Sequence, residues 1–427
     1  MASSPASTPA SPIWPRNAAH DGLIRSALAR PPGRAQVMCM SARREQALEL
    51  MMRFAERTGL TSERPAQRYL WTDAFAVCNL LGLGRATGES HHSELALHLV
   101  DQVHHVLGRH RADDRRSGWI SGLAEEHGEA HPTLGGLRIG KPLPERPADE
   151  PMDERLEWDR DGQYFHYLTK WMHALDQVTR ATEQPLFNSW ARELAQAAHR
   201  AFTYAPRQGG AKRMYWKVSI DLSRPLVASM GQHDPLDGLV TCAQLEATAA
   251  GSGPSLGEAM ADFAAMVEPR GLATGDPLGI GGLLVDAYRI AQLEQQGTRH
   301  FGLVEVLHDA ALVGLRHYVE QPDLHRPASH RLAFRELGLA IGLATLERDE
   351  WPAEGGAAAV RVDRLSRYAP LRAEIEAFWQ RPEHRRVDSW LEHANINDVM
   401  LSTSLQPEGF LLIPPARPRR EPRDDRA

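Results

Sequence analysis

The sequence has few cysteines and few lysines, and it lacks a long apolar run. Its three cysteines, Cys39, Cys78 and Cys242, lie far apart, and none belongs to a CxxC pair. This spacing argues against a disulfide framework and a zinc–thiolate site, and it favours a reducing compartment. Because no stretch of about 18 apolar residues occurs, the sequence predicts no transmembrane span.

Basic charge and the common catalytic motifs are also missing. The formal net charge is -6 and the pI is near 6.4, so no basic excess indicates a nucleic acid or an anionic membrane as partner. No HExxH, GxSxG or GxGxxG motif occurs, which leaves metalloprotease, α/β-hydrolase and dinucleotide-binding functions without support. The segment GGLRIGK (135–141) lacks the residue order of a P-loop, and Pro142 follows Lys141 directly. We therefore expect no cofactor and no metal, with calcium at the clustered carboxylates of 157–161 as the alternative, although EF-hand spacing is absent there.

Lysine is the rarer cation throughout the chain. Only four of the 49 basic side chains are lysine, and all four lie within 77 residues: Lys141, Lys170, Lys212 and Lys217. Where arginine is the default cation, a retained lysine indicates that a compact amine matters at that position. These lysines share their segments with several acids and tryptophans.

Both ends of the chain differ in composition from its middle. Residues 1–38 are rich in Pro, Ser and Ala, and residues 413–427 are densely charged, so we expect a disordered tail at each end. The N-terminal segment lacks the apolar region of a secretion signal, although its Arg and Ser content also fits an organelle transit peptide. We therefore expect a cytoplasmic protein. Because 42% of the residues are apolar, which is enough for a large core, we expect residues 39–412 to form one globular domain.

A repeated helix pair organises this domain. RATGESHHSELALHLVDQVHHVL (85–107) and RATEQPLFNSWARELAQAAHRAF (180–202) both continue from a buried helix through a short polar turn into an amphipathic helix. A looser third copy spans 245–267. The helical patterns along the chain predict twelve helices, or about six hairpins. The one convincing strand pair lies around Lys212–Leu222, where bulky and polar residues alternate.

The connections between hairpins are much longer than the turns within them. Long loops such as 111–160 and 205–233 exceed what a connection requires, and such loops usually carry function. If the hairpins close into a ring, these loops share one face with the N-terminal ends of the more apolar, inner helices. The sequence therefore predicts a site at those helix ends.

Six hairpins, apolar inner helices and "RATG"-like turns resemble the (α/α)6 toroid, or six-hairpin glycosidase-like superfamily. The likeness is architectural and covers about residues 40–410. It implies an all-α toroid with a central cleft. Together with the loops and the strand pair read from the sequence, we expect about six helical hairpins with long loops and a small β-hairpin over one face. The superfamily includes glycoside hydrolases, polysaccharide lyases and N-acylglucosamine 2-epimerases, so the resemblance alone implies no single activity.

The stretch 157–173, EWDRDGQYFHYLTKWMH, combines acids, aromatic rings and cations. Glu157, Asp159 and Asp161 are three acids within five residues, and His166 and Lys170 recur at the spacing of one helix face. Carboxylates move protons, rings stack on sugars and cations orient a polar ligand. The structural alternative is an amphipathic helix with an acidic first turn.

Several further segments carry similar chemistry. The candidate catalytic carboxylates are Asp73, Glu157, Asp159, Asp161 and Asp237. The candidate substrate-binding residues are Trp71, Trp119, Lys141, Trp158, His166, Lys170, Trp216, Lys217, Arg224, His233 and His393. Each has a structural alternative, since a buried acid is often paired, a tryptophan can belong to the core, and most histidines are structural.

These features lead to three functional hypotheses. The first is a glycoside hydrolase that acts on a small or oligomeric saccharide through paired carboxylates. The second is a sugar epimerase or isomerase resembling the N-acylglucosamine 2-epimerases, in which histidines would transfer the protons. The third is a non-catalytic toroid that binds a saccharide or a protein.

Overall fold

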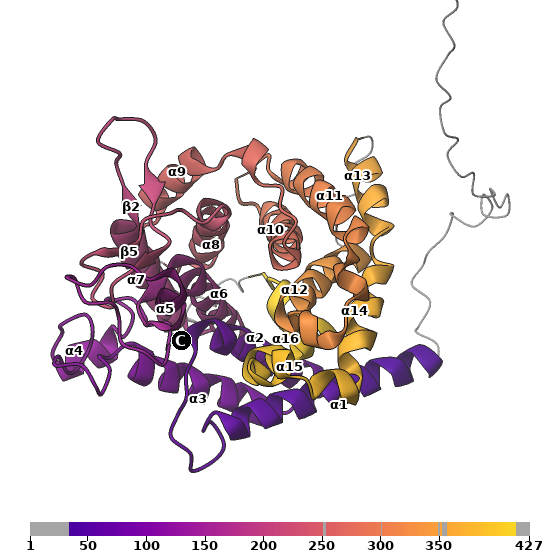
Figure 1. Cartoon of the computed structure of the whole chain (residues 1–427), viewed down its shortest axis with the longest axis horizontal. Coiled ribbons are helices and arrows are strands. Elements are labelled where there is room, and N and C mark those ends of the chain that lie inside the picture. Colours follow the sequence, from indigo (N-terminus) through magenta and orange to yellow (C-terminus); the bar gives the residue numbers. More distant parts are fainter. Residues whose placement is uncertain (1–33, 251–252, 300, 349–350, 352–356, 416–427) are drawn as a thin grey trace, which may run out of the picture. The chain divides into compact units, whose positions relative to one another are not determined.

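The computed structural model describes residues 34–250, 253–299, 301–348, 351 and 357–415 (Figure 1). The chain divides into two units, Met1–Ala42 and Arg43–Ala427. The first unit contains only the start of one helix among the described residues, and the account below concerns the second. Most of the two predicted tails lies outside the described residues, except that helix α1 already begins at Arg34 and the chain is described as far as residue 415.

The chain is mainly helical, as predicted, with a few short antiparallel strands. The α-helices are α1 (Arg34–Arg57), α2 (Leu70–Thr87), α3 (Ser90–Leu107), α4 (Glu125–Ala130), α5 (Glu154–Asp159), α6 (Phe165–Thr182), α7 (Pro185–Phe202), α8 (Asp234–Thr248), α9 (Gly257–Met266), α10 (Pro277–Gln295), α11 (Val304–Glu320), α12 (Ala333–Leu343), α13 (Ala357–Ser366), α14 (Pro370–Gln380), α15 (Asp388–Leu391), α16 (Ala394–Leu405) and α17 (Glu408–Leu411). Short 3-10 helices lie at Pro269–Gly271, Pro322–His325, Ala328–His330, Ala344–Glu347 and Pro382–Arg385. No helix in the described part of the chain is long and apolar enough to cross a membrane.

The two small sheets use the predicted strand segment in an unexpected way. The strands are β1 (Gln163–Tyr164), β2 (Thr203–Tyr204), β3 (Arg213–Met214), β4 (Lys217–Val218) and β5 (Pro225–Val227). Antiparallel pairing gives one sheet in the order β1-β4-β5 and a second sheet of β2 and β3. The segment Lys212–Leu222 thus supplies strands to both sheets instead of pairing with itself.

Six helices contact one another in a cyclic order that can be followed in Figure 1. The contacts run from α2 to α6, α8, α10, α12 and α16 in turn, and α16 contacts α2. Helix α2 is buried at most of its positions because it is apolar on nearly every side. By contrast, α3 is amphipathic and buries a stripe that includes Leu95, Leu99 and Val103. The helices of the cyclic series therefore supply much of the buried core. Each of α3, α7, α9 and α11 packs against the helix that precedes it in the sequence.

The two RAT turns have the same geometry. Helix α2 ends before Gly88, which has φ 77°, and α6 ends before Glu183, which has φ 61°. In both turns the backbone N–H of this left-handed residue donates to the carbonyl four residues earlier, a common way to end a helix. Helices α3 and α7 then resume within three residues. The predicted repeat of helix pairs is confirmed here.

Candidate functional site

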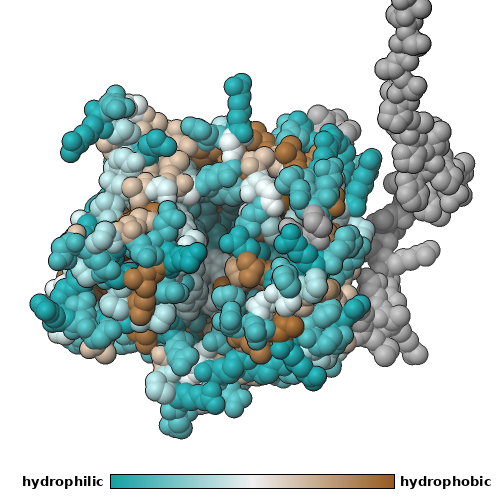
Figure 2. Space-filling model, viewed as in Figure 1, coloured by the Kyte–Doolittle hydropathy of each residue, from teal (hydrophilic) through white to brown (hydrophobic). Residues whose placement is uncertain are grey.

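A cavity of about 270 Å³ lies among the N-terminal ends of α2, α6, α8 and α10. Figure 2 shows the same face as Figure 1, hollowed near its centre. The cavity is lined by acids, histidines, a lysine, aromatic and aliphatic side chains and several glycines: Trp71, Phe75, His166, Lys170, Trp216, His233, Asp234, Asp237, Asp276, Leu278, Gly279, Gly281, Gly282, Val285, Asp286, Gly338, Ile341, Met400 and Phe410. It occupies the helix ends at which the sequence predicts a site.

The first turns of α6 and α8 supply the charged groups that face each other. His166 and Lys170 stand one helical turn apart on α6, and Asp234 and Asp237 stand three residues apart on α8. Pro235 lies in the first turn of α8, where the missing N–H of proline costs nothing. The positive end of the α8 dipole lies beside both aspartates, which favours a negative charge there.

Asp237 is held as a carboxylate by the surrounding cations. Its Oδ2 atom accepts hydrogen bonds from Lys170 Nζ at 2.7 Å and from Thr169 Oγ1 at 2.5 Å. Its Oδ1 atom lies 3.5 Å from Arg289 Nη1. Burial raises the pKa of the Asp237 carboxyl, but the charges of Lys170 and Arg289 and these hydrogen bonds outweigh it and hold the pKa below the ordinary value. Asp237 is therefore held in its ionised form.

Two neighbouring aspartates have the opposite tendency. Burial, followed by the nearby charge of Asp237, raises the pKa of Asp234 to about 7 and that of Asp286 to about 6. Asp234 Oδ2 is buried and has no hydrogen-bond partner among the described residues, while Oδ1 lies 3.9 Å from His166 Nδ1. Asp286 Oδ1 accepts a hydrogen bond at 3.2 Å from Arg289 Nη1, the same nitrogen that contacts Asp237. The cavity thus pairs an ionised carboxylate with carboxyls that hold a proton more tightly.

A buried network fixes Arg289 beneath the carboxylates. The guanidinium donates to Gln244 Oε1 from Nη2 at 2.8 Å and from Nε at 3.2 Å, and to Thr241 Oγ1 at 3.1 Å. Gln244 Nε2 in turn donates to Asp176 Oδ2 at 2.6 Å. Because each donor faces an acceptor, the amide of Gln244 has only one favourable orientation. That orientation holds the Arg289 guanidinium where it contacts both Asp237 and Asp286.

Both histidines of the cavity have a reduced affinity for protons. Burial lowers the pKa of His166, and the neighbouring charge of Lys170 lowers it further. Burial also lowers the pKa of His233, whose Nε2 atom donates to the carbonyl of Leu272 at 2.8 Å. Since neutral imidazole has one donor nitrogen, Nδ1 of His233 is an acceptor.

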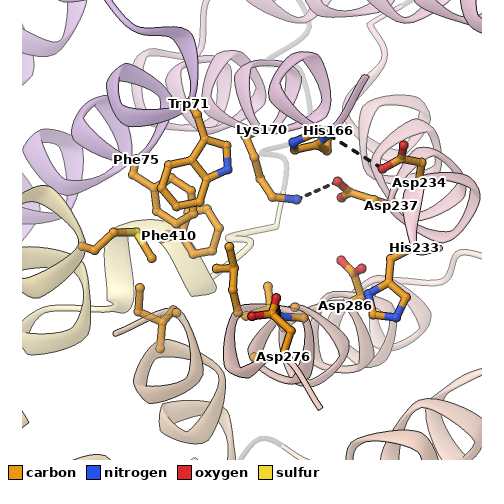
Figure 3. Close-up of a pocket in the computed structure, with 18 of the residues that line it drawn as sticks. Trp71, Phe75, His166, Lys170, His233, Asp234, Asp237, Asp276, Asp286 and Phe410 are labelled. Atoms are coloured by element: carbon orange, nitrogen blue, oxygen red, sulfur yellow. Dashed lines mark hydrogen bonds and ion pairs between the residues drawn. The ribbon is translucent and has the colours of Figure 1, made fainter. Parts of the chain in front are cut away.

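Aromatic rings form another part of the cavity wall. The rings of Trp71 and Phe75 are 4.6 Å apart, and Phe75 stacks on Phe410 at 4.3 Å. Trp216 lies parallel to the ring of His166 at 6.1 Å. Figure 3 shows Trp71, Phe75 and Phe410 across the cavity from the aspartates of α8 and α10.

Six of the residues that the sequence singles out line this cavity. They are Trp71, His166, Lys170, Trp216, His233 and Asp237. They come from three helices and one strand connection that lie far apart in the sequence, and they include one of the five predicted catalytic acids.

The acids of the 157–161 stretch lie elsewhere. Glu157 is buried between Lys217, whose Nζ donates to Oε1 at 2.9 Å, and Arg146, whose Nε donates to Oε2 at 3.0 Å. Asp161 is fully buried and accepts from Arg138 Nη1 at 2.6 Å and from the backbone N–H of Gly140 at 3.0 Å. Both acids therefore tie the long 108–153 connection to the strands and do not line the cavity. Asp159 is exposed to solvent outside it.

The other predicted residues also lie outside the cavity, each with its own structural contact. Buried Asp73 lies 3.5 Å from Arg68 Nη1 and accepts from the backbone N–H of Tyr69, and burial raises its pKa to about 6. The remaining contacts are with rings or backbone. Trp119 is buried under Arg109, and Lys141 lies over the ring of Tyr69. Trp158 is 53% exposed and packs edge-on against Trp216. Arg224 donates a hydrogen bond to the carbonyl of Arg146, and the ring of His393 packs against Phe334.

Neither Asp286 nor Asp234 is among the residues that the sequence singles out. A signal for Asp286 existed, because an acid within the apolar run LGIGGLLVDAYRIA of α10 has to be buried. Asp234 makes no capping hydrogen bond, and the residue before α8 is His233. The described residues include no group of three or more His, Cys, Asp or Glu side chains arranged to hold a metal ion.

Comparison with known proteins adds no family to this geometry. No family model matches the sequence, no curated protein matches it, and no solved structure matches the fold. The function has to be argued from the cavity itself.

Proposed function

We propose that α2, α6, α8, α10, α12 and α16 are the inner helices of an (α/α)6 toroid. The cyclic order of their contacts supports this arrangement, as do their outer partners α3, α7, α9, α11 and α14. In the resulting scheme the segment Arg43–Arg57 of α1 is the outer partner of α16, since Ser402 of α16 donates to the carbonyl of Ala47 at 3.0 Å. The cavity then lies at the N-terminal end of the inner ring.

We further propose that this cavity hydrolyses a glycosidic bond. One observation carries the proposal: Asp237 and Asp286 approach the same nitrogen of Arg289 from two helices, and their pKa values are displaced in opposite directions. Carboxyl pairs separated in this way divide the roles of acid and base. Glycoside hydrolysis uses two such carboxyls on either side of the bond that breaks.

The roles follow from the charges. Asp286 carries the proton and donates it to the glycosidic oxygen as the bond from that oxygen to the anomeric carbon breaks. Asp237, ionised, removes a proton from the water that attacks the anomeric carbon. Lys170 and Arg289 keep Asp237 ionised and correctly oriented, and Trp216 offers a ring surface to the sugar.

The test begins with a panel of mono- and disaccharide glycosides, uronates and N-acyl sugars. Ligands are found by thermal shift, and turnover is measured by release of reducing sugar. Asp237→Asn and Asp286→Asn should each lower kcat at least about 100-fold, the usual contribution of a general acid or base. The exposed Asp159→Asn is the matched control and should keep wild-type activity. Unchanged kcat in both cavity variants would rule out this mechanism, and binding without turnover would make the chain a saccharide-binding protein.

A sugar epimerase is the second candidate because His166 and His233 both line the cavity as weakly basic imidazoles. A neutral imidazole can accept a proton from the carbon next to a carbonyl group. Incubation of each sugar in heavy water distinguishes the two activities. Deuterium incorporation at a ring carbon without hydrolysis, lost in His166→Gln, would favour the epimerase over the hydrolase.

A further inference from the structure

The cavity has two chemically different halves, which Figure 3 shows on opposite sides. Its polar half includes the two carboxyl groups that the proposed hydrolysis uses, Asp237 and Asp286, together with Asp234 and Lys170. Its apolar half includes the aromatic side chains of Trp71, Phe75 and Phe410. Aliphatic side chains add to the apolar lining of the cavity: Leu278, Val285, Ile341 and Met400. A ligand that fills the cavity must match both halves.

The three rings of the apolar half pack against one another, and none is more than 6% exposed. The ring centroids of Trp71 and Phe75 are 4.6 Å apart, and those of Phe75 and Phe410 are 4.3 Å apart, so the three rings form one continuous surface. A sugar presents hydroxyl groups around its whole edge. Hydroxyls pressed against this surface would lose water and find no acceptor in exchange, which is unfavourable. A second sugar unit is therefore a poor occupant of the apolar half.

The volume of the cavity sets a limit on the ligand. A dry protein cavity of about 150 Å³ accommodates benzene. At about 270 Å³, the cavity has room for roughly two ring-sized groups and not for an oligosaccharide. One ring fits against the carboxyls, and one fits against the aromatic surface.

We propose that the substrate is a glycoside of one sugar unit with an apolar, ring-sized aglycone, the non-sugar group attached through the glycosidic oxygen. This inference rests on the proposed hydrolase function. The sugar lies against Asp237 and Asp286, and the aglycone lies against Trp71, Phe75 and Phe410. Hydrolysis then releases a free sugar and an apolar alcohol or phenol, with the proton of Asp286 on the oxygen of the leaving group.

Equilibrium binding of non-hydrolysable glycosides to the full chain tests this assignment. A binding measurement does not depend on how readily the aglycone leaves in the reaction. The probes are phenyl and methyl thioglycosides of the sugar that scores in the panel, since their sulfur linkage resists hydrolysis. We expect the phenyl compound to bind at least about tenfold tighter by calorimetry, the discrimination that a few apolar atoms give in a well-formed pocket. Phe75→Leu should reduce this ratio several-fold while the Kd of the methyl compound stays near its wild-type value.

Phe187→Leu provides the matched control, because Phe187 is also a buried phenylalanine but packs against Trp190 outside the cavity. It should leave the ratio unchanged. If both thioglycosides bind and the ratio is near one, the aglycone assignment is wrong and the hydrolase proposal stands. If neither binds and no glycoside of the panel is turned over, the hydrolase proposal fails and the aglycone assignment fails with it.

Discussion

Gly282 offers a way to fill part of the cavity without replacing any charged group. It lies on the cavity face of α10 and is exposed there, and a Cβ atom added to it would meet nothing within 4 Å. The side chain of a Gly282→Leu variant therefore extends into empty space. Since each heavy atom takes about the volume of a water molecule, ~30 Å³, its four atoms fill about 120 Å³. That is nearly half of the cavity volume of about 270 Å³.

The same substitution should not weaken the fold. Glycine in a helix interior costs about 1 kcal/mol relative to a good helix former, so replacing Gly282 adds helix propensity. The exposure of one apolar side chain in the cavity partly offsets this gain in stability. We expect the free energy of unfolding to stay the same or to rise by up to about 1 kcal/mol, which corresponds to a Tm change of about 2 °C or less.

The assay compares ligand binding and turnover in wild-type protein, Gly282→Ala and Gly282→Leu. Ligand binding should fall at least about 100-fold in Gly282→Leu, because the remaining ~150 Å³ holds one ring-sized group instead of two. Gly282→Ala adds a single methyl group and should have a much smaller effect. Wild-type affinity and kcat in Gly282→Leu, in a protein with unchanged Tm, would refute the assignment of this cavity as the site.

Three further predictions address stability and are read from urea unfolding. Gly281→Ala should destabilise the protein by about 1–3 kcal/mol, because its Cβ atom would lie 2.2 Å from the carbonyl oxygen of Gly338 and push α10 away from α12. An unchanged midpoint of urea unfolding would contradict this close packing. The pKa of Asp234 is about 7 in the folded state and near 4 in the unfolded state, so the free energy of unfolding of the wild type should decline as the pH rises through this range. Asp234→Asn should remove about 2–4 kcal/mol of that decline. Equal slopes of stability against pH in the two proteins would exclude Asp234 as the source of the decline. Gln244→Leu removes the acceptor of Arg289 and should lower the free energy of unfolding by about 2–4 kcal/mol and shift the pH profile of kcat. A lower stability with an unshifted pH profile would show that the network is structural only.

The helices were predictable from the sequence because their signals are local. The two RAT segments carry a turn and an apolar period within about 23 residues, and both form the predicted helix pairs. The strands depend on distant partners. Lys217 pairs with Tyr164 in β1, and Met214 pairs with Thr203 in β2, and no local pattern identifies those partners.

The candidate site was predictable only in part. His166 and Lys170 were recognised because their helical spacing puts them on one face, and both line the cavity. The acids near them were harder to judge, because composition does not reveal whether a partner neutralises a charge. Glu157 is neutralised by Lys217, which lies 60 positions away in the sequence. The retained lysine at 217 thus marks a buried ion pair and not a substrate contact.

The contacts that join α16 to the start of the chain have a consequence for biosynthesis. Ser402 bonds to Ala47 across 355 positions, and Asn79 donates to the carbonyl of Val399 across 320. Neither contact can form until the ribosome has made the polypeptide as far as α16. Until then α2 has no covering partner on that side, and its apolar surface is open to other chains. We therefore expect nascent chains that stop before α16 to aggregate or to recruit chaperones, and folding to be slow relative to helical proteins dominated by local contacts.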